Sequence, residues 1–168
     1  MNKNDVLRRI RFIFDFNDSD MISIFKHAGH EVSREQVCNW LKKDNDPARK
    51  KCTDTELALF LNGLINHKRG KKEGAQPVPE QTLNNNAILK KLKIALNFQA
   101  EDMIRALTLA GLKISKHELS AFFRKFGHKH YRECKDQMLR NFLNGLQLEF
   151  RPETAEEPVA PWGNPPLP

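Results

Sequence analysis

The chain has 168 residues, and 28 Lys and Arg against 21 Asp and Glu give it a formal net charge of +7. No apolar run approaches the roughly 20 residues that a membrane-spanning helix needs, and arginines interrupt the first apolar stretch, which excludes a secretory signal core. With three cysteines, an odd number, the composition indicates a soluble protein of the reducing cytoplasm without a membrane partner.

A pentapeptide, Phe-Leu-Asn-Gly-Leu, occurs at 60–64 and again at 142–146. At the same offset of 82 positions, residues 4–64 and 86–146 share 18 identities in 61 positions. The duplication and its helical periodicity predict an all-α fold of two tandem homologous four-helix units, over 1–67 and 86–151. A unit this small buries only about 60% of its unfolded surface. We therefore expect the units to pack on each other or on a second chain, as a homo-oligomer.

The first helix of each unit is predicted to have one apolar side and one cationic side. Apolar residues recur at helical spacing over 4–14, and the pattern returns over 86–96. The cationic residues are Arg8, Arg9 and Arg11 in the first copy and Lys90, Lys91 and Lys93 in the second. Such a side either lines a phosphate backbone or is simply solvated.

The second and third helices of each unit resemble a helix-turn-helix. The second helix begins near Asn17, among residues that accept hydrogen bonds from unpaired amides, and is expected to end at Gly29. The third helix begins at a capping box of Ser33 and Gln36, and the second unit repeats this box. In a helix-turn-helix the later helix enters the major groove of DNA. The turn is longer here, and any small helical bundle contains two helices joined at a glycine.

The third helices carry the residues that suit contact with a nucleic acid. Arginine suits guanine edges, asparagine and glutamine suit adenine, and lysine binds phosphates. The candidates are Arg34, Gln36, Asn39, Lys42 and Lys43 in the first unit and Lys116, His117, Ser120, Arg124 and Lys125 in the second. The alternative is that these residues form the solvated surface of an ordinary structural helix.

The fourth helix of each unit is predicted to lie at its centre. Gly63 and Gly145 lie inside this helix, where glycine costs about 1 kcal/mol relative to alanine. We therefore expect another helix to approach closely at both glycines. Asn62 and Asn144, beside them, either hydrogen-bond to another helix or point to solvent.

No arrangement for catalysis repeats in both units. Cys52 and Cys134 precede the fourth helices, but no histidine recurs beside them, so we predict small buried side chains rather than nucleophiles. His128, His130 and Cys134 have a spacing that suits zinc, but the first unit does not repeat the histidines. The prediction is no enzyme activity, no catalytic residue, no cofactor and no metal.

Two segments lie outside the units. Residues 68–85 form a basic linker that contains Gly and Pro, which acts as an arm over phosphates or as a plain tether. Residues 152–168 contain six prolines and are predicted to be a largely disordered tail.

The duplicated pattern resembles the YehS-like family. The residues that carry the resemblance are Asp-Met-Ile in the second helices, Ala-Gly in the turns and Phe-Leu-Asn-Gly-Leu in the fourth helices, and it covers about 3–150. The resemblance implies a bacterial, cytoplasmic protein of two tandem helical repeats. It implies no activity and no site residues, because the family is one of unknown function.

Two functions are therefore expected from the surface rather than from chemistry. The first is a binding or regulatory protein for DNA or RNA, since both units are basic. The second is an adaptor that captures a protein partner in an apolar groove between the repeats.

Overall fold

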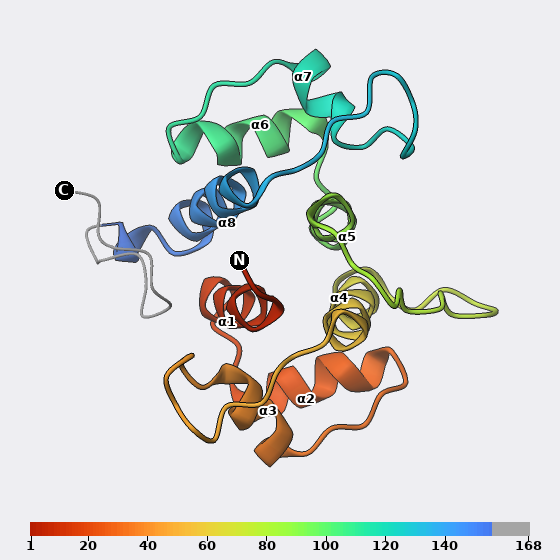
Figure 1. Ribbon diagram of the computed structural model, residues 1–168, viewed down its shortest axis with the longest axis vertical. Coiled ribbons are helices and arrows are strands. Elements are labelled where there is room, and N and C mark those ends of the chain that lie inside the picture. Colours follow the sequence, from red (N-terminus) through yellow and green to blue (C-terminus); the bar gives the residue numbers. More distant parts are fainter. Residues whose placement is uncertain (156–168) are drawn as a thin grey trace.

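The computed structural model of the protein describes residues 1–155, and every regular element in that range is helical, as predicted (Figure 1). The first unit contains α1 (Lys3–Ile13), α2 (Asp18–His27), α3 (Arg34–Leu41) and α4 (Asp54–Arg69). The second unit contains α5 (Asn85–Ala95), α6 (Ala100–Leu109), α7 (Lys116–Ala121) and α8 (Asp136–Phe150), followed by the 3-10 helix η1 (Pro152–Thr154). The predicted all-α fold of two four-helix units is confirmed.

The unit boundaries differ slightly from the predicted ones. α4 continues to Arg69, two residues into the predicted linker, and ends at Gly70, which has a φ of 82°. η1 occupies the first residues of the predicted tail, and the buried Thr154 accepts a hydrogen bond of 3.1 Å from Gln147 of α8. The remaining tail residues, 156–168, lie outside the described residues.

The predicted capping boxes form in both units. Ser33 Oγ accepts from the Gln36 N–H at 3.1 Å, and Gln36 Oε1 accepts from the Ser33 N–H at 2.8 Å. α4 and α7 begin with the same pair of bonds. Gly29 and Gly111 adopt φ values of 76° and 86°, the left-handed conformation that ends α2 and α6.

The two glycines of the repeated pentapeptide allow close helix packing, as predicted. α2 packs on α4, and a Cβ atom placed on Gly63 would overlap the main-chain carbonyl of Ile24. α6 packs on α8 in the same way, with the Ala106 carbonyl over Gly145. A main-chain atom cannot move aside as a flexible side chain can, so these positions require glycine.

The two units pack on each other as an internal pseudo-dimer. α1 of the first unit packs on α8 of the second, and α5 of the second packs on α4 of the first. These four helices form the centre of the molecule, while α2 and α3 lie at one end of its long axis and α6 and α7 at the other (Figure 1). The buried apolar residues of both units form one continuous core. Exchange of equivalent surfaces is the geometry of a two-fold dimer, here within one chain.

Equivalent hydrogen bonds cross the boundary between the units in pairs. Within each pair, the two donors are 82 positions apart in the sequence, and so are the two acceptors. The pairs are Arg9 to Asn144 and Lys91 to Asn62, Met1 to Asp136 and Leu83 to Asp54, and Arg151 to Phe12 and Arg69 to Ile94. The boundary is therefore pseudo-symmetric in its polar contacts as well as in its helix packing.

Candidate nucleic-acid interface

The predicted contact residues lie on α3 and α7, which are far apart in the molecule. The two helices are at opposite ends of the long axis (Figure 1). α3 has eight residues and α7 has six, so neither exceeds about two turns. Most of the predicted residues are exposed, and Asn39, Lys42 and Ser120 are half-buried. The structure therefore places the candidates in two separate sets, one in each unit.

The first turns of α3 and α7 are engaged with the rest of the protein. Gln36 uses its side-chain oxygen in the capping box. Arg34 lies 3.8 Å from Asp18 of α2, and Lys116 pairs with Glu101 of α6. These contacts occupy polar groups that a helix-turn-helix would turn toward base edges.

The ends of α3 and α7 present cations to solvent. Lys43 and Lys125 are equivalent residues of the two units, and both are exposed. The main chain beside Lys43 is held in place, because Arg8 of α1 donates to the Lys42 carbonyl at 3.2 Å. These ends continue into two loops, 42–53 and 122–135, that lead to α4 and α8.

A buried asparagine anchors each loop. Asn4 Nδ2 donates to the carbonyls of Trp40 and Lys50 at 2.8 Å each, and its Oδ1 accepts from the Cys52 N–H at 2.9 Å. Asn86 holds the second loop with the same three bonds. Sequence reasoning missed this pair, although identity of Asn4 and Asn86 within the repeat was a signal.

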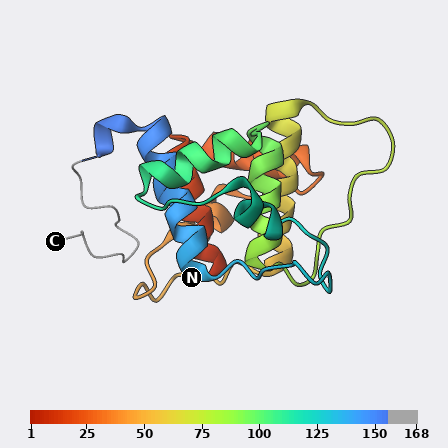
Figure 2. The ribbon, with the colours of Figure 1, turned by 90° about the horizontal axis from the view of Figure 1, so that it is seen from above.

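Both loops reach the same side of the molecule, where the four central helices begin (Figure 2). The Met1 amino group donates a hydrogen bond of 2.6 Å to Asp136, and this bond joins the starts of α1 and α8. The Leu83 N–H donates a hydrogen bond of 2.8 Å to Asp54, and this bond joins the start of α4 to the segment that leads into α5. Because each loop ends where α4 or α8 begins, the two loops share this side.

We call this side the basic face, after the charges of its two loops. The loops contain ten Lys and Arg residues against three Asp and Glu residues, so their net charge is positive. The cations of the basic face are Lys42, Lys43, Arg49, Lys50, Lys51, Arg124, Lys125, Lys129, Arg132 and Lys135.

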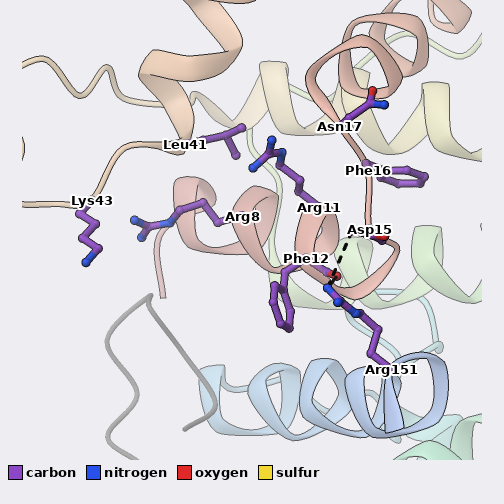
Figure 3. A pocket seen from close by; sticks show the side chains of 9 residues that line it. All are labelled: Arg8, Arg11, Phe12, Asp15, Phe16, Asn17, Leu41, Lys43 and Arg151. Carbon is purple, nitrogen blue, oxygen red and sulfur yellow. Dashed lines mark hydrogen bonds and ion pairs between the residues drawn. The ribbon is translucent and has the colours of Figure 1, made fainter. Parts of the chain in front are cut away.

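A hollow of about 410 Å³ lies between α1, the end of α3 and Arg151 (Figure 3). Arg8, Arg11 and Lys43 line it from the first unit, and Arg151 reaches across from the end of α8 to the Phe12 carbonyl at 3.1 Å. Acidic residues of the first unit pair with Arg8 and Arg11. The fold itself therefore neutralises part of this cationic hollow.

A groove of about 640 Å³ lies between the units, along α4, the linker and α5. Its lining is mixed, with Ile65, Pro77 and Ile94 beside cations of the linker and of α5. The linker residue Gln76 accepts a hydrogen bond of 3.0 Å from Asn66 of α4. The linker thus forms one wall of a groove between the repeats.

Cys52 and Cys134 are small buried side chains, as predicted, and burial raises the pKa of each thiol to about 12. At neutral pH these thiols stay protonated and are poor nucleophiles. No group of three or more His, Cys, Asp or Glu side chains within residues 1–155 is placed to hold a metal ion. In the same part of the chain, no helix is long and apolar enough to cross a bilayer.

Comparison with known proteins gives a family. The model of the family described as protein of unknown function (DUF1456) matches residues 3–70 and again 85–151. The chain is similar to the uncharacterized protein YehS of Escherichia coli (strain K12), with 42% identity over 147 residues, which cover 87% of this chain and 94% of the relative. No solved structure matches the chain.

Proposed function

The chain belongs to the DUF1456 family of proteins of unknown function, and we propose that it binds nucleic acids through the basic face that its two units share. The observation that carries this proposal is the pseudo-symmetric packing of the units. It turns both cationic loops to one side, so that their charges add on one surface (Figure 2). Lysine and arginine side chains on a common surface bind phosphate backbones and release counterions.

Contact with phosphates, rather than reading of base edges, is the mode that this surface favours. Most cations at the ends of α3 and α7 and in the loops are exposed, whereas Arg34, Gln36 and Lys116 in the first turns already have partners. The four central helices also begin on this side, and the start of a helix carries partial positive charge. The ligand class is therefore DNA or RNA, held mainly through its backbone.

Under this proposal the protein acts in the cytoplasm by binding and is not an enzyme. Its two recurring thiols, Cys52 and Cys134, are buried, and their raised pKa values suit a structural role. A binding role also agrees with the repeat, since the features that recur in both units are caps, packing glycines and loop anchors.

Salt dependence of binding tests the proposal directly. Anisotropy of labelled duplex DNA and of labelled single-stranded RNA is measured with the full chain between about 50 and 300 mM salt. We expect log K to fall linearly with log salt concentration, with a slope of about −0.9 per phosphate contacted on duplex and about −0.7 on single strands. Absence of binding to both ligands at the lowest salt would refute the proposal.

Charge reversal then tests the basic face. We expect Lys43→Glu combined with Lys125→Glu to abolish most binding while the unfolding midpoint stays unchanged, because both side chains are exposed. The control, Lys71→Glu combined with Lys72→Glu, makes the same charge change in the linker. Equal loss of binding in the control would mean that net charge matters and the basic face does not.

A second candidate function, protein binding, is favoured by the groove between the units. Ile65 and Ile94 give this groove an apolar part, and Ile94 is 37% exposed. An adaptor would capture a protein partner from a lysate in a salt-tolerant manner. Recovery of nucleic acid alone in such a pull-down would count against it.

A further inference from the structure

The two loops of the basic face have the same main-chain structure. In each loop, three main-chain N–H groups donate to carbonyls at equivalent positions, at 2.9 to 3.1 Å. The donor and acceptor pairs are Asp46 to Lys43, Arg49 to Asp46 and Lys50 to Asn39 in the first loop, and His128 to Lys125, Tyr131 to His128 and Arg132 to Ala121 in the second. The loop therefore folds in the same way with two different sets of side chains.

The side chains that differ include an exposed aromatic ring. Phe126 stands where the first unit has Asp44, and Tyr131 stands where it has Arg49. Phe126 is 82% exposed, more than any other phenylalanine among residues 1–155. Because the first loop folds with Asp44 at this position, the fold does not require an aromatic residue there.

The ring of Phe126 is supported from one side. The Tyr131 ring meets it at a centroid distance of 5.4 Å and an interplanar angle of 76°. The loop beneath is ordered by Asn86, and by the His130 N–H, which donates to His128 Nδ1 at 3.0 Å. Phe126 thus offers solvent a ring on an ordered support.

The loop that carries this ring is rich in exposed cations. Arg124, Lys125, Lys129 and Arg132 of the same loop are all exposed. The Arg132 guanidinium lies over the Phe122 ring at 5.3 Å, which restrains it. A hollow of about 340 Å³ separates α7 from the loop, and its lining includes the predicted contact residues His117, Ser120 and Arg124.

We propose that the 122–135 loop is a stacking platform for single-stranded nucleic acid, in which Phe126 receives a base and Arg124, Lys125 and Lys129 bind neighbouring phosphates. This inference rests on the proposed function and adds a strand preference to it. Proteins that bind single strands combine cations along the backbone with aromatic rings on which bases stack. In a duplex the bases already stack on each other, so the ring has no base to receive.

The charge around Phe126 favours this ligand over a protein partner. Aromatic anchors of protein interfaces fill apolar pockets from which water is excluded. Phe126 instead belongs to a loop with five Lys and Arg residues, and the single acid of this 122–135 loop, Glu133, lies 2.9 Å from Lys135. A polyanion with planar rings satisfies both the charge and the exposed face.

Truncation of the ring tests the platform in the full chain. At constant salt, we expect Phe126→Ala to weaken binding of a labelled single-stranded oligonucleotide by about 5- to 100-fold, the loss of one stacked base. The salt slope stays unchanged, because no cation is removed. Binding of the corresponding duplex changes by less than about twofold, since its bases remain stacked on each other.

Two further variants make the result specific. Phe126→Trp keeps an aromatic ring and binds the single strand as wild type does. The single strand quenches the fluorescence of the added indole, so the total decrease in fluorescence is larger than in wild type. Val78→Ala removes an equally exposed apolar side chain from the linker and leaves binding unaltered. Thermal unfolding of all variants matches the wild type, because Phe126 and Val78 are exposed.

The outcomes separate this inference from the proposed function. If wild type binds neither ligand at low salt, the proposed function is wrong, and the platform with it. If wild type binds with steep salt dependence but Phe126→Ala binds the single strand equally well, only the platform is wrong. Equal loss on single strand and duplex would also overturn the strand preference.

Discussion

Lys91 Nζ on α5 donates a hydrogen bond of 2.6 Å to Asn62 Oδ1 on α4, across the boundary between the two units. Arg9 on α1 donates to Asn144 on α8 at the equivalent positions. Asn62 and Asn144 are the asparagines of the repeated pentapeptide. The sequence left two roles open for them, a hydrogen bond to another helix or exposure to solvent. The same residue type thus holds both sides of the pseudo-dimer.

Loss of the asparagine that accepts from Arg9 is expected to destabilise the protein. Arg9 is fully buried, and burial, followed by the charge of Arg140, lowers its pKa to about 10, so it remains charged at neutral pH. Asn144→Leu keeps the volume but removes the acceptor, at a cost of about 1.5 to 3 kcal/mol for a hydrogen bond to a charged group. Urea unfolding followed by circular dichroism measures this loss.

The control is Asn62→Leu on the other side of the boundary. The Lys91 side chain is 13% exposed, whereas Arg9 is fully buried, so we expect a smaller loss of stability there. Equal losses for the two variants would contradict the role given to the burial of Arg9.

A methyl group at the packing glycine is expected to force two helices apart. In Gly63→Ala the new Cβ overlaps the Ile24 carbonyl, so α2 has to move away from α4. Overpacking of this kind costs about 3 kcal/mol, since the obstacle is main chain. Thermal unfolding provides the measurement. An unfolding midpoint equal to that of wild type would refute the packing argument.

Local features of the fold were predictable, and contacts between distant segments were not. Capping boxes and helix ends depend on residues within one turn, so Ser33 and Gly29 identified them. The role of Gly63 followed from the cost of glycine inside a helix. The anchors Asn4 and Asn86 were missed because their partners lie 36 to 48 positions away, where no periodicity indicates them.

The candidate interface was predicted in its chemistry but not in its shape. Cationic residues at the ends of the third helices were found from the sequence, among them Lys43 and Lys125. That both loops share one side depends on how α1 packs on α8 and α5 on α4, which charge patterns do not specify. The exposure of Phe126 was missed because an aromatic residue in a short loop is usually assigned to the core.

Removal of a loop anchor is expected to loosen the loop and lower stability. Asn86→Ala leaves the carbonyls of Phe122 and Arg132 and the N–H of Cys134 without their present partner, at a cost of about 3 kcal/mol in total. Hydrogen exchange over 122–135 should accelerate, and single-strand binding should weaken as the platform loses its support.

Asn84→Ala is the matched control for the loop anchor. It removes a single capping bond of 2.8 Å to the Ala87 N–H at the start of α5, which costs about 1 kcal/mol. We expect Asn84→Ala to leave exchange in the loop unchanged. If it accelerated exchange over 122–135 as much as Asn86→Ala, the loop would respond to the stability of α5 and not to its anchor.

Asp136 is expected to make stability depend on acid pH. The Met1 amino group at 2.6 Å, and then Asn85 at 2.8 Å, hold the pKa of Asp136 below its ordinary value. A carboxyl with a lowered pKa in the folded state stabilises the protein above its unfolded pKa of about 3.9, and this contribution disappears as the pH falls through the folded pKa. Asp136→Asn should therefore be less stable than wild type at pH 7, with a difference that shrinks toward about pH 2. The effect is small, because the carboxylate is 48% exposed.

Urea midpoints between pH 7 and about pH 2 measure this difference in stability. The control is Glu133→Gln, at an exposed neighbouring residue. A difference between Asp136→Asn and wild type that stays constant with pH would show that Asp136 stabilises through packing instead of charge.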